Sequence, residues 1–233
     1  MKEIKDPARL DKYLAQHSLE DIFHAPLRPH LHLYAFEPGE ALCSQGESTD
    51  ALHVLVKGKI KIYTTSPEGK TLVISFKNPP DMVGDIEYVR DLDIINTVEA
   101  VSPVTVIGIS GTAVKRYGDD HAPLLKFMLD VITKKFYIKS DFLSFNLMYP
   151  VEVRLASYLL SVCYDESDEG FEGRLAISQL TDTANLIGTS YRHLNRVIRR
   201  LSEEGMVERG GGYLHVRDRD RLSRLAGRNL YEH

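Results

Sequence analysis

Cysteine is scarce and tryptophan is absent in this chain of 233 residues. The two cysteines, Cys43 and Cys163, are too few for a disulfide framework and for a four-thiolate zinc or iron–sulfur site in one chain. Each lies in an apolar stretch, and free cysteines are usually buried. We therefore expect two ordinary core thiols, no metal site and no cofactor.

Long hydrophobic runs are also missing. No segment approaches the roughly 20 consecutive apolar residues that span a bilayer, and the opening residues MKEIKDPARL are too charged for a signal peptide. We expect a cytoplasmic protein without a membrane partner. The sequence offers no nucleophile–base pair and no phosphate-cradling loop, so we expect no catalytic residues and no enzyme activity.

The net charge of −4 by itself argues against binding to nucleic acid, but the charges are unevenly distributed. The segment from Gly188 to Gly227 carries nine arginines against five acidic residues. A basic C-terminal segment on an acidic chain is typical of a regulator with one module that faces DNA.

Short runs of alternating apolar residues fill the region from Leu31 to Ser110 and indicate strands. The runs cover residues 53–56, 59–63, 70–76, 97–101 and 104–109. Gly39, Gly46 and Gly58 lie outside the runs, where tight turns need a positive φ that glycine adopts without penalty. Many short strands in this spacing predict a closed or two-sheet antiparallel unit.

The glycines carry a more specific signal. Pro38-Gly39-Glu40, Gln45-Gly46-Glu47 and Lys57-Gly58-Lys59, followed by Val83-Gly84-Asp85, have the spacing found in cyclic-nucleotide-binding β-rolls. This pattern resembles the sensory domain of the CRP/FNR regulators. The resemblance implies an effector pocket at the following positions: Ile74, Phe76, Gly84, Asp85, Ile94, Asn96 and Ser140.

The family's clamp for a cyclic phosphate is missing from these positions. Nucleotide-binding members have a Gly-Glu pair and, about ten residues later, an Arg-Ser pair whose arginine donates charge-assisted hydrogen bonds. This chain has Gly84-Asp85 and then Ile94-Ile95. A phosphate buried against Ile94 would be an unpaired charge, so we expect no binding of cyclic AMP or cyclic GMP. An apolar or peptide-like effector, a protein partner and an empty, constitutively active roll all stay open.

One pattern points to a different class of protein. His30, His32 and Glu37 superficially match the metal triad of a cupin, which would make the chain a β-barrel enzyme. The flanking glycines are misplaced, and no second histidine motif follows downstream. A cupin-type metal enzyme is kept only as a remote alternative.

From His121 to Asn146 the apolar residues change to a helical period. One stripe, interrupted by Lys135, predicts the dimer interface: Leu124, Met128, Val131, Ile138, Phe142 and Phe145. A second stripe runs alongside: Leu125, Leu129, Ile132, Phe136 and Leu143. One stripe can pack on the roll and the other on a partner helix. A helix length of about 39 Å favours a parallel homodimer over burial of both stripes in one chain.

After an expected hinge at Tyr149-Pro150, the pattern predicts a helix over residues 151–164 and an acidic loop over 165–173. A helix-turn-helix is predicted over residues 177–198. Small Ala184 allows its two helices to approach closely, and Gly188 supplies the turn between them. Ser190 is a natural N-cap for the second helix.

The second helix carries the residues expected to contact DNA. They are Thr189, Ser190, Tyr191, Arg192, His193, Asn195, Arg196, Arg199 and Arg200. Arginine can bind guanine bidentately and asparagine can bind adenine in the same way. Ser190, Tyr191 and Arg200 are better placed for phosphates, which fix register without reading sequence. The alternative is a solvated basic face on a structural helix.

A wing and a closing helix complete the pattern. Residues 205–209 and 213–216 predict two short strands around Gly210-Gly211-Gly212, and residues 217–225 predict a final helix. This order of elements resembles the CRP/FNR superfamily over nearly the whole chain, and Ser190-Tyr191-Arg192-His193-Leu194 is closest in wording to the YeiL-type branch. The family's usual Arg-Glu start of the recognition helix reads Tyr191-Arg192 here, so the operator half-site of nucleotide-responsive members does not carry over.

Together these patterns predict an α+β fold in three parts. A cyclic-nucleotide-binding-like β-roll (a jelly roll) is expected over residues 1–120, a dimerisation helix over 121–147 and a winged helix-turn-helix over 148–233. The expected function is a DNA-binding transcription regulator, a homodimer on a pseudo-palindromic site. Its expected partners are double-stranded DNA, a second copy of the chain, RNA polymerase and an unknown small-molecule effector. The alternative is a sensor of a non-nucleotide ligand or a protein partner, with DNA binding as the readout.

Overall fold

The computed structural model describes residues 1–48, 50–69, 71–163 and 174–227, without the side chains of Leu72 and Phe142. By its internal contacts the chain divides into two compact units, residues 1–64 with 76–137 and residues 65–75 with 138–233. The acidic loop expected at 165–173 lies outside the described residues. Among the helices described, none is long and apolar enough to cross a membrane.

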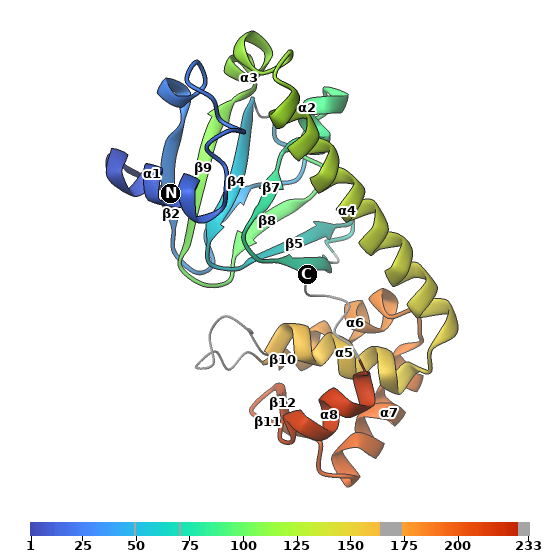
Figure 1. The fold of residues 1–233 in the computed structure, drawn as a ribbon. Helices are drawn as coiled ribbons and strands as arrows, with labels where there is room; N and C mark the ends of the chain where they lie inside the picture. Colours follow the sequence, from blue (N-terminus) through green and yellow to red (C-terminus); the bar gives the residue numbers. More distant parts are fainter. Residues whose placement is uncertain (49, 70, 164–173, 228–233) are drawn as a thin grey trace. The chain divides into compact units, whose positions relative to one another are not determined.

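Two antiparallel sheets form the N-terminal roll (Figure 1). The larger sheet has the order β1-β2-β9-β4-β7 and consists of β1 (Lys2–Ile4), β2 (His32–Phe36), β9 (Val104–Ser110), β4 (Ala51–Lys57) and β7 (Asp81–Val83). The smaller sheet has the order β3-β8-β5-β6 and consists of β3 (Ala41–Cys43), β8 (Thr97–Ala100), β5 (Ile60–Thr65) and β6 (Thr71–Lys77). The expected two-sheet antiparallel unit is confirmed. Strand β1, which no sequence pattern indicated, extends the larger sheet by pairing with β2.

Strand β4 divides its side chains between two apolar cores because successive residues of a strand point to opposite faces. Leu52, Val54 and Val56 belong to a cluster that also contains residues of α1 (Pro7–Gln16), α3 (Gly111–Tyr117) and the start of α4 (Ala122–Met148). Leu55 belongs to a second cluster, made by apolar residues of both sheets. The remaining helical segments of this unit are η1 (Arg28–His30) and α2 (Asp85–Arg90).

Two of the motif glycines lie where the backbone approaches another strand. Gly58 has φ +85°, and a Cβ there would stand 2.4 Å from the Pro103 carbonyl oxygen. Gly84 has φ +90°, and a Cβ there would stand 2.8 Å from the Ala51 carbonyl oxygen. A side chain fits at neither position, so the glycine spacing has a steric cause.

Helix α4 buries the stripe that the sequence assigned to the dimer interface. Leu124, Met128 and Val131 belong to the chain's own apolar core, and Phe145 is buried as well. The assignment of these four residues to the dimer interface is therefore wrong, because side chains packed inside one protomer are not available to a partner helix.

The apolar side chains of α4 that remain exposed belong mainly to the second stripe. Ile138 of the first stripe is half-buried, and the side chain of Phe142 lies outside the described part of the structure. We call the following residues the exposed stripe: Leu125, Leu129, Phe136, Leu143 and Leu147. Their exposed fractions run from 46% for Leu125 to 79% for Leu147.

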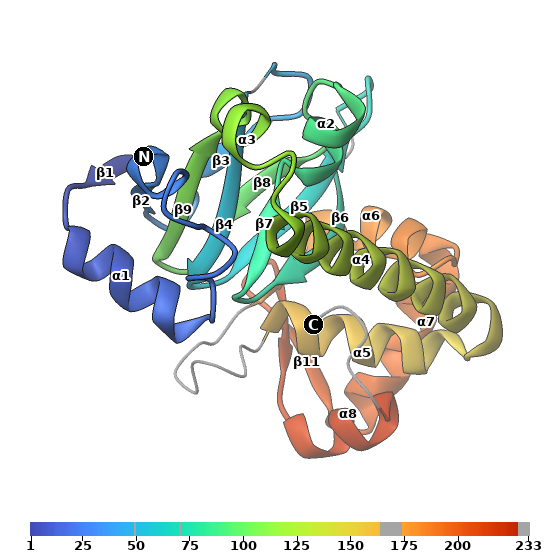
Figure 2. The same cartoon turned by 45° about the horizontal axis from the view of Figure 1, so that its top comes forward.

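Lys135, which interrupts the buried stripe, bonds to residues of β7 and of the start of α2. Figure 2 shows the ribbon of α4 passing beside β7. Its Nζ donates to Asp85 Oδ1 at 2.7 Å and to the Met82 carbonyl at 2.7 Å, and lies 3.6 Å from Asp81 Oδ1. Lys77 Nζ lies 3.5 Å from Asp81 Oδ2. All four charged side chains are at most 14% exposed. We call Lys77, Asp81, Asp85 and Lys135 the charge cluster; burial lowers the pKa of Lys77, against the opposing effect of Asp81.

The second unit has the predicted helix-turn-helix and wing. Its elements are α5 (Val151–Cys163), β10 (Leu175–Ala176), η2 (Ile177–Gln179), α6 (Leu180–Leu186), α7 (Tyr191–Glu203), β11 (Val207–Gly210), β12 (Tyr213–Val216) and α8 (Arg219–Ala226). The strands form a sheet in the order β10-β12-β11. Strand β10 was not expected; it pairs Leu175 with Leu214 and ties the start of the helix-turn-helix to the wing.

The two cysteines are packed against apolar residues. Cys163 is buried in the core of the second unit, and burial raises its pKa to about 12. Cys43 is half-buried against the core between the sheets, and burial, reinforced by the charge of Glu87, raises its pKa to about 11.

Replacing Lys135 is expected to destabilise the fold. The substitution Lys135→Met leaves two buried aspartates against one lysine, and breaking a buried ion pair in this way costs about 3–5 kcal/mol of unfolding free energy. Urea denaturation of the purified protein measures the loss. The neighbouring Lys134 is exposed, and Lys134→Met is expected to change the unfolding free energy by at most about 0.5 kcal/mol. Equal stability of the two variants would contradict a structural role for the charge cluster.

Candidate DNA-binding surface

The turn between α6 and α7 is held by contacts with α5 and α6. Gly188 has φ +65°, and a Cβ there would stand 3.1 Å from Arg154 Nη1 of α5. The buried guanidinium of Arg154 donates to the Ile187 carbonyl, and the Thr189 N–H donates to the Ala184 carbonyl at 2.8 Å. The predicted turn at Gly188 is confirmed, and Arg154 fixes it from the neighbouring helix.

Helix α7 begins at the predicted cap. The Ser190 hydroxyl accepts a hydrogen bond from the His193 N–H at 3.2 Å, which satisfies one of the free donors at the helix start. Leu194, Val197 and Leu201 are buried in the core of the second unit, as is Ile198. These apolar residues fix which face of α7 points outward.

The outward face of α7 is basic. Four arginines of this helix have exposed side chains: Arg192, Arg196, Arg199 and Arg200. Tyr191 is 48% exposed, whereas Thr189, His193 and Asn195 are half-buried at the edge of the same face. Nothing in the core requires arginine at these positions, so the concentration of positive charge points to an anionic partner.

One member of the predicted set is engaged by the protein itself. Arg200 Nη2 lies 3.0 Å from Glu152 Oε1 of α5, and its Nε lies 3.8 Å from Glu204 Oε1. The ion pair with Glu152 raises the pKa of Arg200. Its expected role at a phosphate would compete with this pairing.

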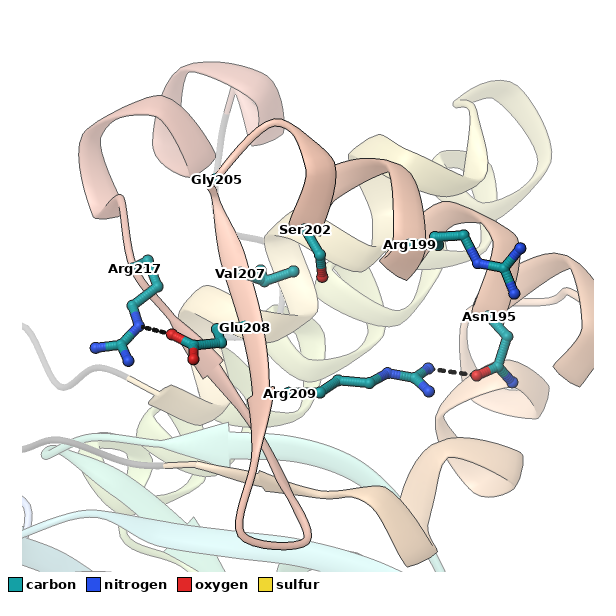
Figure 3. A pocket seen from close by; sticks show the side chains of 8 residues that line it. All are labelled: Asn195, Arg199, Ser202, Gly205, Val207, Glu208, Arg209 and Arg217. Carbon is teal, nitrogen blue, oxygen red and sulfur yellow. Dashed lines mark hydrogen bonds and ion pairs between the residues drawn. The ribbon is translucent and has the colours of Figure 1, made fainter.

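The wing adds two further arginines to this surface, and one of them contacts α7. Strands β11 and β12 pair Val207 with Val216 and Arg209 with Leu214, and the hairpin turns through Gly211 at φ +59°. Arg209 donates to Asn195 Oδ1 on α7, and Arg217 forms an ion pair with Glu208 (Figure 3).

These side chains line a cavity of about 450 Å³ between α7 and β11. Arg209 and Arg217 were counted in the basic segment of the sequence but were not assigned to the surface. For Arg209 a signal was available in the sequence. Successive residues of a strand point to opposite faces, so Arg209 lies on the same face of β11 as Val207, two residues earlier.

The predicted effector-pocket residues divide between the two units. Phe76, Gly84, Asp85, Ile94 and Asn96 lie in the first unit. Ile74 and Ser140 fall in the second. Of the first group, Phe76, Asp85 and Ile94 are buried.

The segment around Ile94 is bonded into the roll. The Ile94 N–H donates to the Glu47 carbonyl at 2.9 Å, and its own carbonyl accepts from the Gly46 N–H at 2.8 Å. The same unit also contains a buried cation that sequence reasoning missed: the Lys59 ammonium lies 5.3 Å from the centre of the Phe76 ring.

The histidines of the cupin-like pattern have other neighbours. His32 Nδ1 lies 3.1 Å from Glu3 Oε1, and His30 stacks on Tyr117 with ring centres 5.0 Å apart. In the part of the chain that the structure describes, no three histidine, cysteine or acidic side chains are placed to hold a metal ion. The remote enzyme alternative has no site among these residues.

Both halves of the chain match known domain families. Residues 34–121 match the cyclic nucleotide-binding domain, and residues 153–225 match the Crp-like helix-turn-helix domain.

Similar full-length proteins are regulators. The regulatory protein YeiL of Escherichia coli O157:H7 is 23% identical over 214 residues, covering 91% of this chain and 94% of the relative. The CRP-like cAMP-activated global transcriptional regulator of Mycobacterium tuberculosis is 23% identical over 206 residues, covering 87% and 91%. The crystal structure of a CRP/FNR-family transcriptional regulator from Eubacterium rectale superposes with a TM-score of 0.68 at 20% identity, covering 96% of this chain and 99% of that one.

Arg192 and Arg196 are expected to contact base edges. Removing either by substitution with alanine should weaken binding to the cognate DNA by about 1–3 kcal/mol and relax the base preference at one position. Fluorescence anisotropy on the cognate duplex and on its single-base variants measures both effects. Equal losses on cognate and random DNA would instead make these arginines phosphate contacts.

Proposed function

Because the chain belongs to the CRP/FNR superfamily of transcription regulators, we propose that it binds a pseudo-palindromic DNA site as a homodimer. The observation that carries the proposal is the basic outward face of α7, fixed by a buried apolar face opposite. Half-sites about 34 Å apart, one helical turn, suit a two-fold symmetric dimer. In this proposal residues 1–120 form the sensory roll, 121–147 join two copies and 148–233 bind DNA.

The exposed stripe of α4 supports the dimer. Leu125, Leu129, Phe136, Leu143 and Leu147 lie at intervals of four or seven residues, with half-buried Ile132 between the second and third. This spacing is the heptad pattern of a two-helix coiled coil. Burying this apolar surface between two helices would stabilise their association by about 25 cal/mol for each Å² removed from water. We assign this stripe to the partner helix.

The residues of α7 divide by position between bases and phosphates. Arg192, Asn195 and Arg196 lie in the first turns of α7, the part of a recognition helix that reaches base edges in the major groove. The cap region, Thr189 to Tyr191, stands at the helix start, where backbone N–H groups and the helix dipole favour a phosphate.

We propose further that the regulator does not respond to cyclic nucleotides. By the resemblance in sequence, the buried Ile94 stands where nucleotide-binding members have the phosphate-binding arginine, and the Asp85 carboxylate is paired with Lys135 of helix α4. An incoming phosphate would face an apolar side chain and bring a second negative charge toward Asp85. Isothermal titration of cyclic AMP and of cyclic GMP should therefore give no binding at micromolar ligand; a micromolar Kd for either would overturn this part of the proposal.

Selection from a random duplex pool, with purified protein and nothing added, tests the proposed function. We expect enrichment of a two-fold symmetric motif whose half-sites are centred 10–10.5 base pairs apart. This result would also favour a roll that needs no effector. Failure of the wild-type protein to enrich any motif would mean that this form does not bind specific DNA.

Two variants of α4 make the same experiment report on the dimer. Phe136→Asp places a charge in the exposed stripe and is expected to give a monomer of 26.4 kDa that loses the symmetric motif. Lys134 is exposed on the opposite side of the helix, and Lys134→Asp should leave dimer and motif unchanged. Light scattering on the purified variants measures the mass.

A further inference from the structure

We infer that Arg209 of the wing is a specificity-determining residue, which positions the Asn195 amide for reading one base of each half-site. The inference rests on the proposed function, in that α7 must contact base edges. It adds a role for the wing, namely control over what the recognition helix reads.

The Asn195 amide is held at both ends. Its Nδ2 donates to the Tyr191 carbonyl of the preceding helical turn at 2.9 Å, and its Oδ1 accepts from the Arg209 guanidinium. A guanidinium can only donate and a carbonyl oxygen can only accept. A flipped amide would place two donors together at Arg209 and two acceptors together at Tyr191. The two contacts therefore fix which end of the amide is oxygen.

The fixed amide keeps the groups that a bidentate base contact needs. An asparagine side chain has two N–H donors and an oxygen with two lone pairs. One donor and one lone pair are used in the contacts with Tyr191 and Arg209, so one of each remains. Adenine presents one acceptor and one donor in the major groove, N7 and the N6 amino group. We assign adenine as the base that Asn195 reads.

Arg209 acts through its position on the wing. Val207, two residues earlier on β11, is buried in the core, so the strand that carries Arg209 is anchored. Arg209 itself is exposed and Asn195 is half-buried at the edge of the cavity in Figure 3. Losing a contact between such side chains changes protein stability little. The substitution Arg209→Ala should leave the melting temperature within roughly 3 °C of the wild type.

A matched control is available on the same hairpin. Arg217 is 61% exposed at its side chain and carries the same charge, but its guanidinium pairs with Glu208 of the adjacent strand. Arg217→Ala removes a positive charge from the wing without touching the Asn195 amide. The two alanine variants therefore separate loss of charge from loss of amide positioning.

The test is a base-by-base affinity matrix on the selected site for the wild type, Arg209→Ala, Asn195→Ala, the double variant and Arg217→Ala. For the wild type we expect a preference for adenine of roughly 5- to 150-fold at one position of the half-site. Asn195→Ala should abolish this preference, and Arg209→Ala should reduce it by at least about fivefold at that position only. The double variant should match Asn195→Ala, because the two residues act as a unit. Arg217→Ala should weaken all sequences alike and keep the preference.

Three outcomes would overturn the inference. Arg209→Ala could lower affinity uniformly and reduce the salt dependence as Arg217→Ala does, which would make Arg209 a phosphate contact. The effects of Arg209→Ala and Asn195→Ala on the preference could simply add. The wild type could select a symmetric motif with no adenine preference that Asn195→Ala removes. A wild type that selects no motif at all would instead contradict the proposed function.

Discussion

The charge cluster fixes how helix α4 lies against the roll. Its members are costly to bury alone and are tolerated because two lysines meet two aspartates within 3.6 Å. Lys135 reaches its partners in one rotational setting of α4 about its axis. Since an α-helix turns by about 100° per residue, that setting also decides which apolar side chains face the roll and which face outward. The apolar surface that α4 leaves exposed is thus set by an ion pair on the neighbouring, buried face of the helix.

A similar hierarchy operates in the second unit. The buried apolar face of α7 and the turn held by Arg154 fix the rotation of the helix about its axis. The arginines of α7 are exposed as a result. The wing then adds side chains to the edge of that face from a separate strand pair. Scaffold contacts therefore determine the direction of the basic residues, while the identity of those residues is free to change with the DNA sequence that is bound.

Sequence reasoning was most successful where one residue type has a single physical purpose. Gly58, Gly84 and Gly188 marked turns because a side chain would be strained or would collide there, and Ser190 marked the start of α7. It failed on α4 because two apolar stripes with helical spacing run side by side, and spacing alone does not say which one packs inward.

Lys135 was the missed signal on α4. A lysine inside an apolar stripe needs buried carboxylates, and two aspartates follow one another at short spacing in the otherwise apolar segment 81–86. The link between Arg209 and Asn195 could not be predicted, since it depends on how far the wing strand reaches toward α7. That reach is set by packing in three dimensions and by no local pattern.

The raised pKa values of Cys43 and Cys163 have a practical consequence. Thiol alkylation proceeds through the thiolate, and raising the pKa of Cys43 from an ordinary value of 9.0 to about 11 lowers its ionised fraction at neutral pH by roughly 100-fold. A cysteine introduced at an exposed site, such as the wing tip, would react with a maleimide dye well before either native thiol. The natural sequence is therefore already a suitable background for single-site fluorescent labelling, and the motion of the wing on DNA can be followed without first removing its cysteines.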